Sequence, residues 1–402
     1  MKSAFLHGDL KEEVFIDQPP GYAKLGNKHK VYKLNKALYG LKQAPRDWYN
    51  RIETYFLKEG FQKYCYEHTL FIKIEDGGKM LIVCLYVNDI IYTGNNTTMF
   101  GSFKKSMMVE FEMSDLGMMH YFLSIEVMQS SIGIFLSQKK YVQKILDKFQ
   151  MKDCNPVNTP SEFGMKLNKD NGGKKVDDTL YKQIVGSLMY LTATRPDIMH
   201  AESVISRYME CPTEIHLLAA KRIFQYLQGT KEFGLFYKNG ETSYLFGFID
   251  SDYTGDLDHR KSTSRYVFMM GTGAVSWSLK KQPIVTLSSS EAEFVAATAC
   301  ACQAIWLNKI LKELHFKEDG PTQIYSDNSS TIKLSKNPVL HSQSKHIDVK
   351  YHFLRDLTNG VIYLIYCKSE DQITDILTKH LKFPTYYKLR KLLGDCTSNI
   401  SI

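Results

Sequence analysis

The clearest pattern of hydrophobic and polar positions lies in the last third of the chain, between residues 244 and 379. Short runs rich in Phe, Tyr, Ile and Leu and bounded by turn residues favour strands. Five such runs predict strands, at Tyr244–Asp250, Arg265–Met270, Ala274–Trp277, Gln323–Asp327 and Val361–Cys367. Glycines separate the second run from the third, which indicates that these two strands form a hairpin.

Three helices are predicted in the same region. Apolar residues at three- and four-residue steps from Phe294 to Trp306 indicate an amphipathic helix that begins at the serines 288–290. Asn328 is placed to cap a second helix. A third helix is expected after the last strand, with acidic residues, including Asp375, in its first turns.

Four acidic residues stand at the edges of these elements. Asp250 and Asp327 end strands, and the working site of an open α/β sheet lies outside the carboxyl ends of its strands. Glu293 and Asp375, near helix starts, can face the same crevice. Clustered carboxylates repel one another unless cations neutralise them, and oxygen ligands suit Mg²⁺ or Mn²⁺. Two such ions about 3.5–4 Å apart promote hydrolysis of a phosphodiester, so the sequence predicts a two-metal nuclease site. Either Asp250 or Asp252 can be the first metal ligand, because residues two positions apart in a strand point to the same face of the sheet.

Each carboxylate also has a purely structural interpretation. Glu293 stands three residues after Ser290 and is placed to close a capping box. Asp327 suits an ordinary turn, and Asp375 suits the dipole at a helix start. For a single residue these alternatives are the stronger ones, and the catalytic interpretation depends on the four residues together.

The first 240 residues carry a different set of patterns. Leu81–Tyr92 predicts a strand, a tight turn and a second strand, and Trp48 to Phe56 marks one face of a helix. Tyr121–Val127 and Ile134–Gln138 predict a hairpin, which a helix beginning near Tyr141 follows. The patterns from Tyr181 to Leu227 predict a helical connection.

The order strand-Asp, hairpin, helix-Glu, strand-Asp, strand, helix-Asp resembles the ribonuclease H fold. The amino-acid sequence of many stretches resembles the copia-type retrotransposon Pol polyprotein. The matching stretches are Ile249–Asp256, Arg260–Ser264, Ser276–Trp277, Lys280–Pro283, Leu287–Glu293, Ser326–Asn328, Lys345–His352 and Glu370–Lys379. The resemblance implies that Asp250, Glu293 and Asp327 hold metal ions, and that Asp375 binds the second ion and helps to position the water.

The same resemblance extends to a reverse transcriptase palm. Leu34–Pro45 is similar to the family's template- and nucleotide-positioning motif, in which Gln43 would touch the incoming base region. The strand-turn-strand segment resembles the polymerase hairpin whose tip carries two adjacent aspartates, but here the tip is Asn88-Asp89. A further family aspartate would stand immediately before position 1. Ser124 occupies a position where the family usually has glycine. With two of three expected acids missing, we expect that this chain does not polymerise DNA.

The resemblance therefore implies a fold of class α+β and α/β with several domains. We expect a truncated reverse transcriptase palm over residues 1–128 and a thumb with a helical connection over 129–240. A ribonuclease H-like α/β domain with a mixed sheet is expected over 241–381, and a tail over 382–402.

Composition indicates the size class of the protein, the charge of its partner and its location in the cell. The chain has 402 residues, too many for one core, and its net charge of +8 suits a polyanionic partner. Eight cysteines without a CxxC pair, no signal peptide and no uncharged run of membrane-spanning length predict a soluble intracellular protein without a membrane partner. By resemblance the location is cytoplasmic, in a virus-like particle, with access to the nucleus.

Three functions follow as hypotheses. The first is a ribonuclease H-type endonuclease that cleaves the RNA strand of an RNA–DNA hybrid with two Mg²⁺ or Mn²⁺ ions, beside an inactive polymerase site. The second is a non-catalytic nucleic-acid-binding remnant of a decayed element. The third is an RNA-directed DNA polymerase whose missing palm acids come from a partner subunit.

Overall fold

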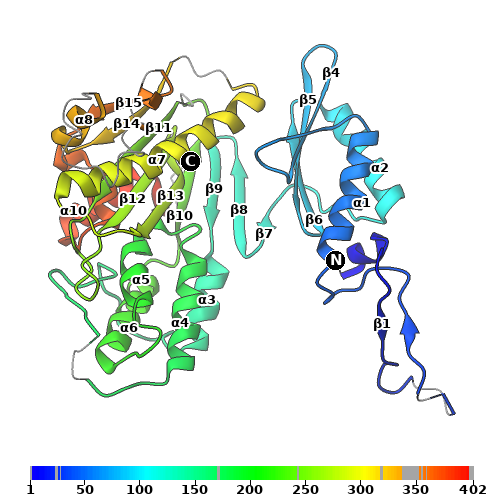
Figure 1. Cartoon of the computed structure of the whole chain (residues 1–402), viewed down its shortest axis with the longest axis horizontal. Helices are drawn as coiled ribbons and strands as arrows, with labels where there is room; N and C mark the ends of the chain where they lie inside the picture. The colour runs from blue at the N-terminus through cyan, green and yellow to red at the C-terminus, as the bar shows by residue number, and fades with distance from the viewer. Residues whose placement is uncertain are drawn as a thin grey trace. The chain divides into compact units, whose positions relative to one another are not determined.

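The computed structural model describes residues 2–22, 26–27, 29–169, 173–241, 244–316, 320–336, 353–354, 356–358 and 360–397. The chain forms two compact units, residues 1–119 and residues 120–402 (Figure 1). Both units combine helices with β-sheets, so the prediction of mixed α and β structure is confirmed, and the structure contains several sheets.

An antiparallel sheet in the order β3-β4-β5-β6 forms the centre of the first unit. Two amphipathic helices pack with it in one core, where Trp48 and Phe56 of α1 meet Phe103 of α2 and Phe71 of β4. The elements are η1 (Lys2–His7), β1 (Phe15–Ile16), β2 (Tyr32–Lys33), α1 (Ala44–Lys58), β3 (Gln62–Lys63), β4 (Leu70–Glu75), β5 (Lys79–Tyr86), β6 (Asp89–Gly94) and α2 (Thr97–Phe111).

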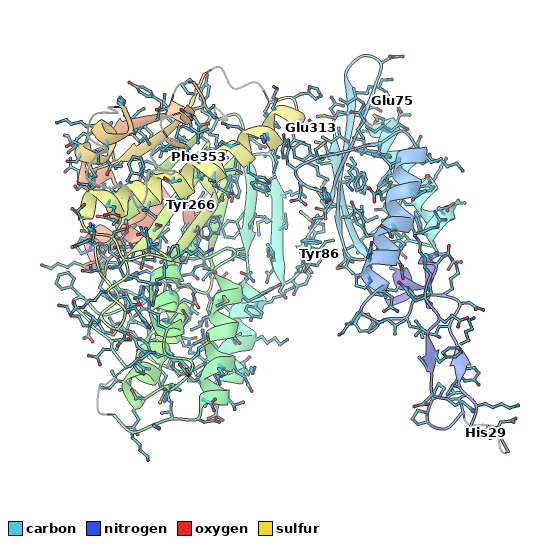
Figure 2. All side chains as sticks on the ribbon, in the orientation of Figure 1. His29, Glu75, Tyr86, Tyr266, Glu313 and Phe353 are labelled. Atoms are coloured by element: carbon cyan, nitrogen blue, oxygen red, sulfur yellow. The ribbon has the colours of Figure 1, made fainter. Side chains whose placement is uncertain are left out.

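The hairpin predicted over residues 81–92 is confirmed by β5 and β6. Tyr86, labelled at the end of β5 in Figure 2, pairs with Asp89, so the turn consists of Val87 and Asn88. Val87 has a φ of 53°, in the left-handed region that a tight two-residue hairpin turn requires.

The second unit contains a first sheet in the order β16-β10-β9-β8-β7, all of whose neighbouring strands are antiparallel. Its strands come from both ends of the unit, because β16 follows β10 by more than 150 residues and still pairs with it. The strands are β7 (Tyr121–Phe122), β8 (Ile125–Ser130), β9 (Gly133–Ser137), β10 (Phe233–Lys238) and β16 (Asp395–Thr397). Helices between β9 and β10 are α3 (Lys139–Lys148), α4 (Asp178–Leu191), η2 (Pro196–Ile198), α5 (Met199–Ser206) and α6 (Glu214–Gly229).

A second, mixed sheet in the order β13-β12-β11-β14-β15 carries the strands predicted in the last third of the chain. Strands β11, β12 and β13 are antiparallel to one another, whereas β14 runs parallel to both β11 and β15. The strands are β11 (Leu245–Ser251), β12 (Thr263–Met270), β13 (Gly273–Lys281), β14 (Thr322–Ser326) and β15 (Ile362–Tyr366). The helices of this region are α7 (Ser289–Glu313), α8 (Ser329–Lys336), η5 (Ser369–Asp371), η6 (Ile373–Leu377) and α10 (Phe383–Leu392).

Helix α7 packs across β11 and β12 (Figure 1). Phe294 and three alanines of α7 are buried in a core with Ile249 and Ile324 of the sheet. The helix is long and apolar enough to cross a membrane by length and composition alone, but its apolar face packs on the sheet, as in the core helices of globular domains.

The other face of this sheet shares a core with the helices of the first half of the unit. Phe248 and Val267 belong to the same buried cluster as Leu188 of α4, Phe224 of α6 and Leu389 of α10. The indole Nε1 of Trp277 also donates to Thr192 O at 3.1 Å. Helices and sheet therefore fold as one unit.

The predicted third helix is wrong in type. The chain after β15 forms two short 3₁₀ helices, η5 and η6, which Gln372 separates with an extended backbone (ψ 95°). The Gln372 side chain is buried and its Nε2 donates to Ile249 O at 2.9 Å. Anchoring Gln372 to β11 interrupts the helix and fixes η6 beside that strand.

Candidate metal-binding and catalytic site

Two of the predicted acids stand at the carboxyl ends of adjacent parallel strands. β11 and β14 pair with Phe248 opposite Tyr325, and two further positions along this register bring Asp250 opposite Asp327. Asp250 is the penultimate residue of β11, and Asp327 directly follows β14. This is the sheet edge at which the sequence predicts a site.

The third acid comes from α7, which packs across the same strands. One carboxylate oxygen from each of Asp250, Glu293 and Asp327 lies within 4.8 Å of the other two. Asp250 and Glu293 are buried, and Asp327 is half-buried and accepts a hydrogen bond from Ser369 Oγ at 2.9 Å. The structure therefore brings three of the four predicted ligands together.

Glu293 does not close a capping box. The cap of α7 is Ser288, whose hydroxyl accepts from Glu291 N at 3.2 Å. The Glu291 carboxylate accepts a hydrogen bond from Leu287 N at 2.8 Å, just before the cap. Glu293 instead faces the sheet, where its Oε1 accepts from Ser251 N at 3.1 Å.

The electrostatics of the cluster favour a cation. Burial, followed by the charges of Asp250 and Asp327, raises the pKa of Glu293 to about 10. Asp250 Oδ2 and Glu293 Oε2 are buried without a hydrogen-bond partner among the described residues. Buried carboxylate oxygens without donors are costly, and three convergent carboxylates form the oxygen donor set of Mg²⁺ or Mn²⁺. The residues present therefore fit a divalent cation.

Asp375 lies in η6, at the rim of this cluster. Its Oδ1 accepts from Lys379 Nζ at 2.8 Å. Burial raises the pKa of Asp375, the lysine opposes this shift, and the charges of Asp250 and Asp327 add to it. The carboxylate therefore lies within electrostatic range of Asp250 and Asp327 without joining the 4.8 Å group.

Asp252, the alternative first ligand, has other partners. Its Oδ2 accepts from Arg265 Nη2 at 2.8 Å and its Oδ1 from Thr263 N at 2.6 Å. Arg265 is fully buried in β12, so it holds Asp252 toward the neighbouring strand. The geometry favours Asp250 as the first ligand.

The residues predicted for a polymerase site lie in the first unit. Asn88 is half-buried in the β5–β6 turn, and Asp89 is exposed at the start of β6. Gln43 is the N-cap of α1, where its carbonyl accepts from Arg46 N and Asp47 N, each at 3.0 Å. Among the described residues, no group of three potential metal ligands includes Asp89.

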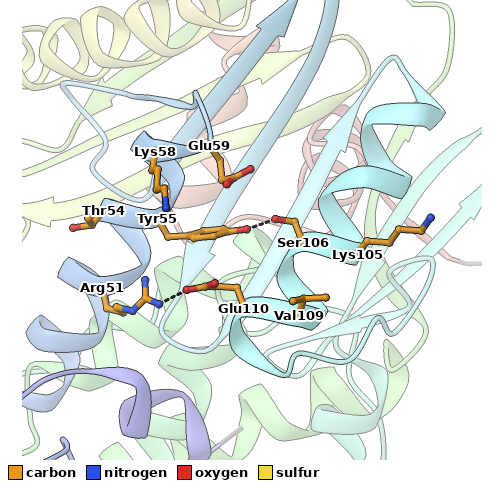
Figure 3. A pocket seen from close by; sticks show the side chains of 9 residues that line it. All are labelled: Arg51, Thr54, Tyr55, Lys58, Glu59, Lys105, Ser106, Val109 and Glu110. Atoms are coloured by element: carbon orange, nitrogen blue, oxygen red, sulfur yellow. Dashed lines mark hydrogen bonds and ion pairs between the residues drawn. The ribbon is translucent and has the colours of Figure 1, made fainter.

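A cavity of about 660 Å³ also opens between α1 and α2 of the first unit (Figure 3). Tyr55 bonds to Ser106 and Arg51 pairs with Glu110 across it. It contains none of the predicted site residues. The lining residues are Arg51, Thr54, Tyr55, Lys58, Glu59, Lys105, Ser106, Val109 and Glu110.

Comparison with known proteins gives the family. The profile of the family "Reverse transcriptase (RNA-dependent DNA polymerase)" matches residues 1–163. The Pol polyprotein of transposon RE1 from Arabidopsis thaliana is 39% identical over 98% of this chain, and that of TNT 1-94 from Nicotiana tabacum is 38% identical over 98%. A protein assigned to transposon Ty5-1 of Saccharomyces cerevisiae is 31% identical over 74% of this chain and 97% of its own length. The chain belongs to the copia-type Pol polyprotein family.

As a copia-type Pol chain, it spans 27% of the RE1 polyprotein and 30% of the TNT 1-94 polyprotein. A foamy viral protease–reverse transcriptase in complex with double-stranded DNA overlaps 84% of this chain and 53% of its own, at 14% identity and a TM-score of 0.21. That overlap is too loose to support an argument about the site.

The predicted site does not include two further residues beside the acidic cluster, Gln372 and Lys379. Lys379 stands four residues after Asp375, a spacing that brings side chains together on helical turns and that could have been used to find it. Gln372 gave no such signal, because its contact with Ile249 O joins positions 123 residues apart. The matching stretch Lys345–His352 lies outside the described residues.

Proposed function

We propose that this copia-type Pol chain is a ribonuclease H-type endonuclease, a hydrolase acting on the RNA strand of an RNA–DNA hybrid. The observation that carries the proposal is the cluster of Asp250, Glu293 and Asp327, whose carboxylate oxygens lie within 4.8 Å of one another at the carboxyl ends of parallel strands. The raised pKa of Glu293 is a further sign of function, because strongly perturbed carboxyl groups gather at catalytic sites.

The four acids have distinct roles in this proposal. Asp250, Glu293 and Asp327 would hold divalent cations, and Asp375 would complete the second cation position and orient the attacking water. Two bound Mg²⁺ or Mn²⁺ ions would supply charge neutralisation and an activated water. Ser251 N and Ser369 Oγ hold the Glu293 and Asp327 carboxylates in place by hydrogen bonds.

The proposed reaction is hydrolysis at phosphorus. The water oxygen forms a bond to phosphorus while the bond from phosphorus to the 3′ oxygen breaks. One water proton is lost from the nucleophile and one proton is taken up by the leaving oxygen, so the products carry a 3′-hydroxyl and a 5′-phosphate. Recognition of the hybrid would depend on groove shape and 2′-hydroxyl groups rather than on base sequence.

The proposal includes domain boundaries that were predicted from the sequence. We assign residues 1–128 to a palm, 129–240 to a thumb and helical connection and 241–381 to the ribonuclease H-like domain. Residues 382–402, predicted as a tail, contain α10 and β16, which pack in the second unit. The polymerase site would be inactive because Asn88 offers one neutral carbonyl where a carboxylate ligand is needed. We place the chain in the cytoplasm, in a virus-like particle, with access to the nucleus.

The test is a comparison of substrates. Purified chain in Mg²⁺ is expected to cut end-labelled RNA in a hybrid, and to leave the same RNA intact when it is single-stranded or paired with RNA. The 3′-hydroxyl products should be extendable by a polymerase without phosphatase treatment. Salt-sensitive binding of the hybrid without cleavage would instead support the non-catalytic remnant.

A further inference from the structure

One basic side chain enters the acidic site. Lys379 Nζ lies 2.8 Å from Asp375 Oδ1, and this is the one ion pair that any of the four acids forms among the described residues. The lysine side chain keeps 52% of its surface exposed, whereas that of Asp375 keeps 11%. Lys379 therefore reaches from the solvent side onto a buried carboxylate.

The fold fixes this pair against the other acids. Lys379 N donates to Asp375 O at 3.1 Å, which places both side chains on the same side of the turn after η6. Gln372 anchors the start of η6 to Ile249, the residue before Asp250. The ammonium charge acts electrostatically on Asp250 and Asp327 as well as on Asp375.

The charge balance changes when divalent cations bind. Four carboxylates carry four negative charges and two divalent ions carry four positive charges, so a lysine that remains in the site makes it net positive. A phosphodiester brings one negative charge to the same place. The lysine ammonium is a compact charge on a flexible stem with three donors, so it can change partners by rotating its side chain.

Building on the proposed nuclease function, we infer that Lys379 is the resident counter-ion of the site. It holds Asp375 in position while no divalent cation is bound, and it passes from Asp375 to a phosphate oxygen of the nucleic acid when cations bind. Lys379 thus both competes with the cations and attracts the substrate.

This assignment predicts opposite effects on cation binding and turnover. Lys379→Met removes the competing charge, so Mn²⁺ should bind about two- to fivefold more tightly. The same change removes the phosphate contact, so hybrid cleavage at saturating Mg²⁺ should fall on the order of 10²-fold. Lys379→Arg keeps the charge and should stay closer to wild type in both measurements.

The test uses the full chain and two independent readouts. Mn²⁺ binding is followed by the electron paramagnetic resonance signal of the free ion, and cleavage of labelled hybrid is measured over a range of Mg²⁺ concentrations. Lys368→Met is the matched control, because Lys368 is an exposed lysine paired with Glu370 rather than with a site acid. Unchanged or weaker Mn²⁺ binding by Lys379→Met would overturn the counter-ion role, and unchanged turnover would overturn the phosphate contact.

The outcome also separates this inference from the proposed function. A wild-type protein that binds Mn²⁺ but does not cleave hybrid would contradict the nuclease proposal and the phosphate contact. Tighter Mn²⁺ binding by Lys379→Met in that protein would still support the counter-ion role. Circular dichroism of each variant shows whether a loss reflects misfolding.

Discussion

The acidic edge of the second unit and the β5–β6 hairpin of the first unit present carboxylates in contrasting ways. At the edge, Asp250 of β11, Glu293 of α7 and Asp327, which directly follows β14, converge within 4.8 Å. In the hairpin, Asp89 is exposed beside the neutral Asn88. The edge concentrates negative charge in a partly buried place, and the hairpin does not.

The difference shows what a metal site requires of a fold. Separate segments must be held together against charge repulsion, and here the α7 core, Ser251 N and the Gln372 anchor hold them. Such an arrangement is stable only if a cation or proton offsets the repulsion. A hairpin tip brings together residues that are adjacent in sequence, but its chemistry depends on which side chains stand there.

Substitution of single acidic residues is expected to give the largest difference between the acidic cluster and the hairpin. Asp327→Asn removes a ligand from the cluster and should lower hybrid cleavage on the order of 10³-fold or more, because cation stabilisation of the reacting phosphate amounts to several kcal/mol. Asp89→Asn, the matched change in the hairpin, should leave cleavage within about twofold, since surface changes away from a site have small effects. Equal losses in the two variants would contradict a site restricted to the second unit.

The dependence of stability on pH tests whether the acidic cluster, unlike the hairpin, is under charge repulsion. The raised pKa of Glu293 means that the folded cluster holds a proton that the unfolded chain releases above pH 4.5. Without divalent cations, the contribution of Glu293 to the free energy of unfolding is therefore fully present below about pH 4.5 and is lost as the pH rises toward 10. The loss between pH 5 and pH 8 is at most about 4 kcal/mol, since one pKa unit corresponds to about 1.36 kcal/mol.

Urea denaturation in EDTA at several pH values measures this effect. Glu293→Gln should flatten the dependence, whereas Asp89→Asn should keep it. Added Mg²⁺ should restore stability at pH 8, because ligand binding to the folded state stabilises it. A wild-type protein whose stability does not fall over this range would show that the cluster is not under charge repulsion.

The smallest expected effect concerns the turn between β7 and β8 in the second unit, where Ser124 has a φ of 63°. A left-handed conformation costs an L-residue about 1–2 kcal/mol and glycine costs about 0.5–1 kcal/mol in chain entropy. Ser124→Gly should therefore stabilise the protein by about 0.5–1 kcal/mol in urea denaturation.

Ser130→Gly, in the extended strand β8, is the control for this change and should not stabilise the protein. Stabilisation by both substitutions would indicate a general effect of glycine. Hybrid cleavage should be unchanged in Ser124→Gly, because the substitution affects the stability of the turn and leaves the acidic cluster intact.

Local patterns in the sequence were sufficient for most elements of this fold. The aromatic and aliphatic runs predicted β11 to β15, and the serines before Phe294 predicted the start of α7, because these signals lie within a few residues. Asn328 caps α8 as expected, accepting from Ser330 N and Thr331 N. The order of acids along these elements was enough to identify the candidate cluster.

Features that depend on distant contacts could not be predicted in this way. The choice of Asp250 over Asp252 depends on the burial of Arg265 in the neighbouring strand. The break between η5 and η6 depends on the contact of Gln372 with β11, and β16 is paired with a strand that precedes it by more than 150 residues. The C-terminal residues gave no periodic signal, yet Arg390 and Asp395 are buried in the structure.

The most direct test measures both activities in one preparation of wild-type chain with Mg²⁺. One reaction contains labelled RNA in a hybrid, and the other contains a primed RNA template with deoxynucleotides. The account predicts cleavage of the hybrid and no primer extension. Full-length extension products would contradict the claim that the β5–β6 hairpin does not support polymerisation. An uncut hybrid, with folded protein bound to it, would contradict the claim that the acidic cluster is a nuclease site.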